Sequence, residues 1–263
     1  MNLSRELATI GVLVRRDLLR LVREKSRLFG VVAQPLLFWI MIGSGMGSSF
    51  AMPGGAAGVD YLEYFFPGVT ALVVLFTAIF STMSLIEDRH AGFLQAVLVA
   101  PSSRLSIVLG KTLGGVIAAL VQAALFLALA PLAGFDFARI DWAAVVLVLS
   151  LLAIGLTALG FALAWWLDST HGYHAVMSVA LFPAWILSGA MFPLEGASPW
   201  LRAAMRANPM TYAVEGLRAA LYGGTAPGGT GALGLAPSCA PLVLAGFATA
   251  MLLLAARACA KRA

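Results

Sequence analysis

The chain has 263 residues, of which 61% are hydrophobic and only 11% are charged, and its mean hydropathy is +0.93. Roughly a quarter of the residues in an ordinary soluble domain are charged, so this composition excludes a soluble globular protein. The formal net charge of +5 does not indicate a nucleic-acid partner, because basic residues in membrane proteins gather on the cytoplasmic side. We therefore expect a membrane protein surrounded by membrane lipids, with no nucleic acid bound.

The first predicted element, residues 1–27, is a helix with two faces, because apolar and basic side chains both recur at spacings of three and four. The apolar face consists of Leu3, Leu7, Ile10, Val14, Leu18 and Leu21, and the basic face of Arg16, Arg20, Arg23 and Arg27. This pattern predicts an amphipathic interfacial helix, with leucines at the acyl boundary and arginines at anionic headgroups. A soluble bundle helix is the alternative, but the uncharged run that follows favours the membrane surface.

Six uncharged segments follow, each long enough for the roughly 20 residues that a helix needs to cross a bilayer. They are residues 28–46, 65–86, 112–135, 142–167, 175–194 and 238–256. Because these runs are continuously apolar rather than alternating, they predict helices and not the strands of a membrane barrel. The predicted fold class is therefore all-α, a polytopic membrane protein whose single transmembrane domain, 1–263, has six spans.

The basic residues fall mainly on one side of the predicted membrane. If the N-terminus is cytoplasmic, nearly all of the 17 lysines and arginines are cytoplasmic too. The exceptions are Arg139, Arg202, Arg206 and Arg218. Acidic residues divide evenly between the two sides, so the asymmetry lies in Lys and Arg alone, as the positive-inside rule requires. We expect both termini in the cytoplasm.

Under these boundaries the spans contain no Asp, Glu, Lys, Arg or His. Ion-coupled pumps and intramembrane enzymes need ionisable groups within the membrane, so the energy for any transport must come from elsewhere. His171 and His174 lie near Asp168, but two imidazoles and one carboxylate without further ligands do not make a metal site. We expect no catalytic residue and no cofactor bound by this chain.

Gly110 and Lys111 resemble the end of a phosphate-binding loop, but Leu105 stands where that loop requires a glycine. We therefore expect no nucleotide site, and we interpret Lys111 as a snorkelling interfacial anchor that tolerates replacement. Gly110 and Gly114 form a pair of small residues four positions apart, which indicates close packing against another helix.

Two segments are not spans. The first, 87–104, is cytoplasmic and apolar for a loop, and it predicts a short helix that begins at the charged residues 87–89 and ends at Pro101. Its apolar side consists of Phe93, Leu94, Val97 and Leu98. Such a surface meets a partner or a membrane, unless it folds back on the spans. The second, 195–222, lies outside and predicts two short helices that dip into the outer leaflet or cap a cavity.

These two segments carry a resemblance to a known family. The run from Glu87-Asp88-Arg89 through Gly92-Phe93-Leu94 to Ala100-Pro101, with Arg104 and Gly110-Lys111, resembles the cytoplasmic signature of type 2 ATP-binding-cassette (ABC-2) permeases. Ser188-Gly189-Ala190-Met191-Phe192-Pro193 and the run from Asn208-Pro209-Met210-Thr211-Tyr212 to Glu215-Gly216-Leu217-Arg218 resemble that family's last conserved block. Gln95 is a departure, because members commonly have Glu there.

The resemblance implies a permease subunit in a bacterial cell (inner) membrane that forms a homodimer and exports a drug, lipid, glycolipid or polysaccharide. A separately encoded cytoplasmic ATPase would drive it and would hold ATP and Mg²⁺. The residues that couple to this ATPase would be Glu87, Asp88, Arg89, Gly92, Phe93, Leu94, Val97, Leu98 and Pro101. The residues of an extracytoplasmic gate or lid would be Asn208, Pro209, Tyr212, Glu215 and Arg218. No residue is assigned to the substrate.

Two other functions compete with transport driven by ATP. An intramembrane enzyme would need buried nucleophiles, acids or metal ligands, which the predicted spans do not offer. A gated channel or a membrane scaffold without ATP coupling fits the composition better. Co-purification with a nucleotide-hydrolysing subunit distinguishes these classes.

Overall fold

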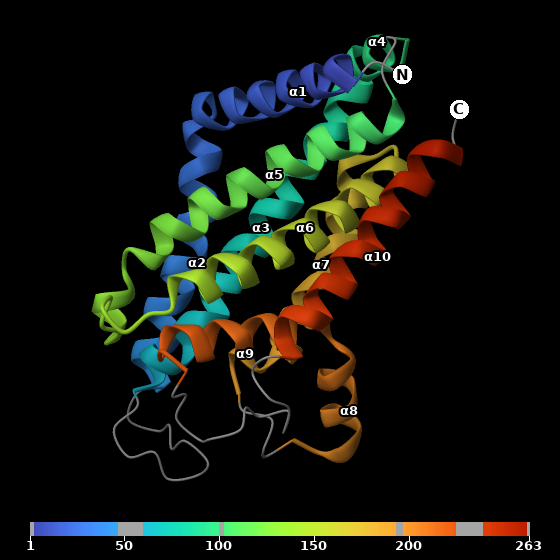
Figure 1. Ribbon diagram of the computed structural model, residues 1–263. Coiled ribbons are helices and arrows are strands. Elements are labelled where there is room, and N and C mark those ends of the chain that lie inside the picture. The colour runs from blue at the N-terminus through green and yellow to red at the C-terminus, as the bar shows by residue number, and fades with distance from the viewer. Residues whose placement is uncertain (1–2, 47–59, 100–102, 193–196, 225–238, 262–263) are drawn as a thin grey trace.

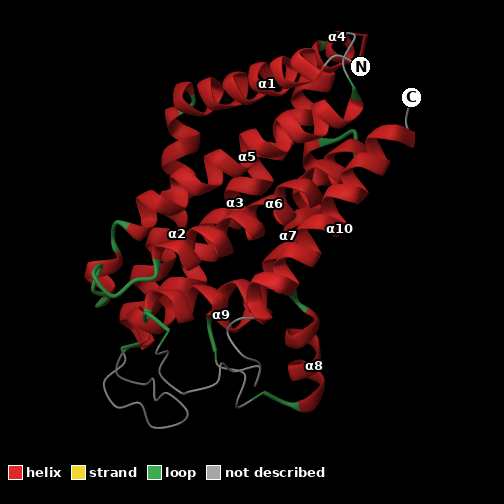
Figure 2. Ribbon diagram, in the orientation of Figure 1, coloured by secondary structure: helices red, strands yellow, loops and turns green. Residues whose placement is uncertain are grey.

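The computed structural model describes residues 3–46, 60–99, 103–192, 197–224 and 239–261, and these ranges contain helices and no strands (Figure 2). In chain order the helices are α1 (Leu3–Arg23), α2 (Lys25–Met46), α3 (Tyr61–His90), α4 (Phe93–Val99), α5 (Arg104–Leu127), η1 (Ala130–Ala133), α6 (Trp142–Trp166), α7 (Thr170–Trp185), η2 (Ile186–Ala190), α8 (Pro199–Ala207), α9 (Pro209–Leu221) and α10 (Cys239–Lys261). The all-α prediction is confirmed.

Within the described ranges, five helical segments are long and apolar enough to cross a membrane: α3, α5, α6, α7 with η2, and α10. The first predicted span, 28–46, lies within α2, where Val32–Met46 is an apolar segment shorter than these five. The helix itself is longer and begins at Lys25. The chain is thus a multi-pass helical membrane protein.

The long helices form a bundle around α3 (Figure 1). In the most apolar part of α3, 78% of the residues are buried, against 22% for α10, so α3 is central and α10 peripheral. Large aromatic side chains fill the centre, where Phe66 stacks on Phe126 at 4.9 Å and meets Trp39 edge-on at 5.4 Å. Such ring pairs stabilise packing beyond the area that they bury.

Polar side chains begin several of these helices. Asp60, Ser103 and Asp141 accept hydrogen bonds from the first backbone N–H groups of α3, α5 and α6. Asn208 ends α8 and begins α9, where its side chain accepts from the Met210 N–H. These caps pair donors that a helix leaves unsatisfied at its N-terminus.

The two ends of the bundle differ. One end carries α1, α4 and the C-terminus of α10, and we call it the α1–α4 end (Figure 1). The other carries α8 and α9, and we call it the α8–α9 end. Both chain termini therefore lie on the same side of the bundle.

Candidate functional site

The short helix α4 is joined to the central helix by a turn of two residues, Ala91 and Gly92. Gly92 has a φ of +75°, a left-handed conformation that favours glycine. Glu87, Asp88 and Arg89 lie in the last turns of α3 and not at the start of α4. The predicted helix start was therefore wrong, because the apolar run of α3 continues as one helix into these charged residues.

The exposed side of α4 differs from the predicted one. Leu94 is only 3% exposed and packs into the bundle core, so at this position the apolar side folds back on the spans, which was the alternative to a partner contact. Phe93 lies under the Arg16 guanidinium, 3.7 Å from its Cζ. Val97 is half-buried, whereas Gln95 and Ala96 are exposed and Val99 is 87% exposed. Leu98 lies in α4, and Pro101 lies outside the described residues.

A cluster of four charges, which we call the charge cluster, joins α1, α3 and α5. Arg16 donates to both carboxylate oxygens of Asp88, at 2.7 and 2.5 Å. Lys111 donates at 2.7 Å to Asp88 Oδ2, the oxygen that lies 2.7 Å from Arg16, and at 2.9 Å to Asp17. Next to it, Arg20 pairs with Glu87 on α3 and, at 2.8 Å, with Glu24.

Lys111 is 6% exposed, so the prediction of a snorkelling anchor was wrong. The span that contains it begins earlier than predicted, at Arg104, and this places Lys111 inside α5. Two cations and two anions in the charge cluster compensate one another, as buried charges must. Burial nevertheless raises the pKa of Asp17 above its ordinary value, although Lys111 donates to it. We therefore expect Asp17→Asn to lower the free energy of unfolding less than Asp88→Asn does.

Helix α1 rests on two glycines of α5. A Cβ at Gly110 would lie 3.0 Å from the Leu13 side chain, and one at Gly114 would lie 3.2 Å from Asp17. The expected close packing at this pair of small residues is thus present, and α1 is the helix packed there. One face of α1 is therefore occupied by α5, and Arg16 and Arg20 pair with carboxylates, where lipid headgroups had been expected.

A second contact fixes the start of α1. Glu6 accepts hydrogen bonds from the backbone N–H and the hydroxyl of Ser103, at 3.1 and 2.7 Å, and from the Ser106 hydroxyl. These hydroxyl donors, that of Ser106 foremost, hold the pKa of Glu6 below its ordinary value. The carboxylate form is therefore the one that ties α1 to the first turn of α5.

The end of α3 is also tied to the turn between α6 and α7. Arg89 pairs with Asp168 and donates to the Trp165 carbonyl at 3.0 Å. His171 and His174 belong to α7 rather than to a loop. No group of three or more His, Cys, Asp or Glu residues that could hold a metal ion occurs in the described part of the chain.

At the α8–α9 end, the predicted lid residues are built into the bundle. Arg218 is 9% exposed and donates to the Gly189 carbonyl at 3.2 Å, while its guanidinium lies over the Tyr64 ring. The Tyr64 hydroxyl donates to the same carbonyl at 3.0 Å. Gly189 can present this carbonyl because η2 breaks helical geometry there, with a φ of +76°.

The other predicted lid residues flank this contact. Asn208 donates to the Ala184 carbonyl at 2.5 Å, and Pro209 opens α9. Tyr212 donates to the Arg206 carbonyl at 2.9 Å, and Glu215 is partly buried. Residues 193–196, which include the last predicted residues of the fifth span, lie outside the described residues.

Comparison with known proteins identifies the family of this chain. The sequence profile of the ABC-2 type transporter family matches residues 8–222. This chain is a member of the ABC-2 type transporter family. The match runs from the first turns of α1 to the end of α9, so it includes both the charge cluster and the α8–α9 end.

Named relatives of this ABC-2 family member support the assignment. The putative transport permease ycf38 of Cyanophora paradoxa is 30% identical over 79% of this chain and 72% of its own length. Nodulation protein J of Neorhizobium galegae is 28% identical over 87% and 86%. The daunorubicin resistance ABC transporter permease protein DrrB1 of Streptomyces coeruleorubidus is 26% identical over 75% and 69%.

Sequence reasoning missed Asp17 and Lys111 as partners in this ABC-2 family member. Lys111 was interpreted as an interfacial anchor, because the predicted spans ended where the first charge appeared, and Asp17 was not singled out. A usable signal was present: Gly110 and Gly114 flank Lys111 on α5, and a helix packed on such glycines brings its own charges next to the lysine.

Acidification should loosen the contact between α1 and α5 through Glu6. A lowered folded-state pKa means that the stabilisation is present above the unfolded-state value, 4.5, and is lost as pH falls through the folded-state value. We expect the thermal unfolding midpoint of Glu6→Gln to lie below that of the parent at about pH 6, and the two midpoints to converge as pH falls below 4.5. Ser106→Ala should shrink this difference, and a pH-independent gap between parent and Glu6→Gln would contradict the prediction.

Proposed function

We propose that this chain is the membrane-spanning permease subunit of an ATP-binding-cassette exporter, driven by a separate cytoplasmic ATPase subunit. The exported molecule is a drug, a lipid, a glycolipid or a polysaccharide. ATP and Mg²⁺ act on the ATPase, and this chain supplies no nucleotide site. Two copies of the chain form the transport path in a bacterial inner membrane, with both termini in the cytoplasm.

The observation that carries this proposal is the attachment of α4. Its Phe93 packs under Arg16, and Arg16 holds Asp88 at the end of the central helix. Its Leu94 is buried in the core. A short helix held in this way transmits a push to the spans, whereas a loose loop would absorb it.

A cleft beside α4 extends the surface on which a partner would dock. It has a volume of about 720 Å³ and lies between α1 and the end of α3. Its lining combines the exposed apolar residues Val12 and Leu19 with Arg15 and Arg23. Apolar contacts framed by arginines are typical of protein interfaces. The ATPase would touch the exposed edge of α4 and this cleft together.

The charge cluster gives the proposal its mechanism. Displacement of α4 acts on α3 through the turn at Gly92 and on α1 through Arg16. Lys111 passes the same displacement to α5, because it binds Asp17 and Asp88 at once. The packed contact of Arg218, Tyr64 and Gly189 then joins α3 to η2 and α9 at the other end, where the exit would open.

The proposal is tested with the double variant Ala96→Asp/Val99→Asp. Both residues are exposed on α4, so the variant should insert normally, yet we expect it to lose most of the Mg²⁺-dependent ATPase activity that co-purifies with the parent from native membranes. Two carboxylates in a desolvated contact leave unpaired charges, which oppose binding. The matched control is Ala204→Asp/Ala207→Asp, with the same spacing on exposed residues of α8.

Two outcomes would overturn the proposal. Parental ATPase retention by the α4 variant would mean that α4 is not the docking element. No ATPase activity with the parent itself would favour the channel or scaffold alternative.

A further inference from the structure

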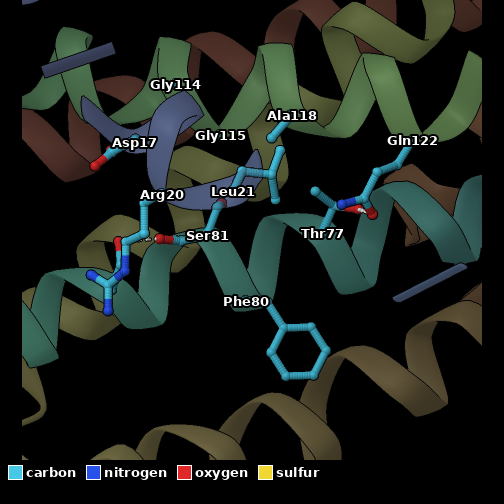
Figure 3. Close-up of a pocket in the computed structure, with 11 residues that line it drawn as sticks. Asp17, Arg20, Leu21, Thr77, Phe80, Ser81, Gly114, Gly115, Ala118 and Gln122 are labelled. Carbon is cyan, nitrogen blue, oxygen red and sulfur yellow. Dashed lines mark hydrogen bonds between the residues drawn. The ribbon is translucent and has the colours of Figure 1, made fainter. Parts of the chain in front are cut away.

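A small crevice with polar groups at both ends lies beneath α1, between α3 and α5, and Figure 3 shows the side chains around it. Its volume is about 30 Å³. Asp17 and Arg20 of α1 lie at one end, Leu21 of α1 lies in the middle, and Thr77 and Gln122 lie at the other end. Most of the remaining lining residues are small: Ser81, Ser84, Gly114, Gly115 and Ala118.

The inner end contains a hydrogen-bond conflict. The Thr77 hydroxyl lies 2.7 Å from the Val73 carbonyl and 2.7 Å from the Gln122 amide oxygen, but one hydroxyl has one proton to donate. Thr77 donates to Val73, which can accept only. The Gln122 amide must then turn its NH₂ toward Thr77, an assignment that the hydrogen-bond network and not the heavy-atom positions decides.

Either orientation leaves one polar atom of Gln122 without a partner. Gln122 is fully buried, and its second amide atom has no hydrogen-bond partner in the described structure. The neighbouring Thr157 hydroxyl, across Gly115, is in the same situation. A buried polar group left unpaired costs roughly 1–3 kcal/mol.

We propose that this crevice is a binding site for ordered water, held between Gln122 and the hydroxyls of α3. Water can donate to or accept from Gln122, so it satisfies the amide in whichever orientation it takes. Ser81 and Ser84 donate to backbone carbonyls at 3.0 and 2.6 Å, and their oxygen lone pairs remain available to accept. The site thus offers several polar partners, as a buried water requires.

The size of the crevice sets the class of ligand. A cavity needs roughly 10–15 Å³ of space open to the centre of a water molecule to hold one water. The crevice offers about 30 Å³ of such space, so it holds one or a few waters and excludes lipids and drugs. The inner end presents neutral hydroxyl and amide groups and no carboxylate. Asp17, at the outer end, is engaged by Lys111. Neutral water therefore fits the inner end better than a metal cation does.

The site has a consequence for the junction of α1, α3 and α5. Direct side-chain bonds would fix these helices in one register, whereas a water-mediated contact can re-form after a small shift. This inference is independent of the cargo and of the ATPase.

The test uses the fact that the chain has three glutamines, Gln34, Gln95 and Gln122. Selective ¹⁵N labelling of glutamine and tryptophan gives a small set of side-chain signals in solid-state NMR of the protein in lipid bilayers. We expect magnetisation transfer from water to the Gln122 amide several-fold above that to the Trp185 indole, which is fully buried and donates to the Gly68 carbonyl at 2.7 Å. Gln95, exposed on α4 outside the spans, is the positive control.

Filling the crevice should remove the signal. Ala118→Leu places a larger apolar side chain in the lining, and transfer to Gln122 should fall to the level of Trp185. If Gln122 already matches Trp185 in the parent, the site is dry and the proposal fails, whether or not the filled variant folds.

The sign of a stability change provides a second readout. Gln122→Met keeps the side-chain length and removes both polar atoms, while Thr77 keeps its bond to Val73. A hydrated site loses a partner for its water, so the thermal midpoint should fall, by about 2–4 °C. A dry site loses an unpaired polar group, and a rise in the midpoint would overturn the proposal.

Discussion

Lys111→Met should lower the free energy of unfolding by about 3–5 kcal/mol, the range found when one partner of a buried ion pair is removed. The substitution keeps a long side chain in α5 but removes the Lys111 bonds to Asp17 and Asp88, and Asp88 keeps its bonds to Arg16 and its 3.5 Å ion pair with Arg20. The measurement is thermal or chemical unfolding of the purified protein in detergent. Limited proteolysis should show in parallel that α1 becomes accessible.

A second substitution shows whether the loss comes from the ion pair. Asp17→Asn in the Lys111→Met background removes the carboxylate that lost its partner, so the double variant should lose less than the sum of the two single losses. Additive losses, or a neutral effect of Lys111→Met, would mean that the lysine is an interfacial anchor after all.

Gly68→Ala should destabilise the α8–α9 end by about 1–3 kcal/mol, the usual cost of overpacking. A Cβ at Gly68 would lie 2.4 Å from the Cβ of Ala190 and 2.8 Å from its Cα, so the backbone of η2 would have to move. That movement would disturb the Gly189 carbonyl, which accepts from Tyr64 and Arg218. The measurement is the unfolding midpoint.

Gly246→Ala is the matched control, because this glycine also lies within a helix but nothing stands within 4 Å of its added Cβ. Alanine is favoured over glycine in a helix by roughly 0.5–1 kcal/mol, so this control should be neutral or slightly stabilising. Equal losses at both positions would contradict the packing argument.

Composition was sufficient to predict the fold class, because continuous apolar runs cannot be hidden in a soluble protein. Helix α6 spans Trp142–Trp166, where the sequence indicated 142–167. The limits of α3 and α5 were not predictable in the same way. An apolar run ends at its first charge, but a helix continues past that charge when partners on other helices neutralise it, as Arg16 does for Asp88.

The direction of an amphipathic face was equally hard to predict. The spacing of Phe93, Leu94 and Val97 indicates one apolar side on a short helix, but not whether this side turns toward a partner or toward the chain's own spans. Leu94 is buried in the core because the turn at Gly92 folds α4 back against α3. The charge cluster was missed for a related reason, since it joins residues of three helices that are far apart in sequence.

The length of α3 gives the molecule a lever. Thirty residues make a rod of roughly 45 Å, about 15 Å longer than the hydrocarbon core of a bilayer. Lipid tails cannot cover a rod of this length along its whole length when it crosses upright, and Glu87 and Asp88 lie in its last turns, at the α1–α4 end. A tilt of about 10° of such a rod would carry one tip several ångströms relative to the other. In the proposed coupling, a small rotation imposed at α4 would thus be converted into a displacement of Tyr64, whose hydroxyl donates to the Gly189 carbonyl.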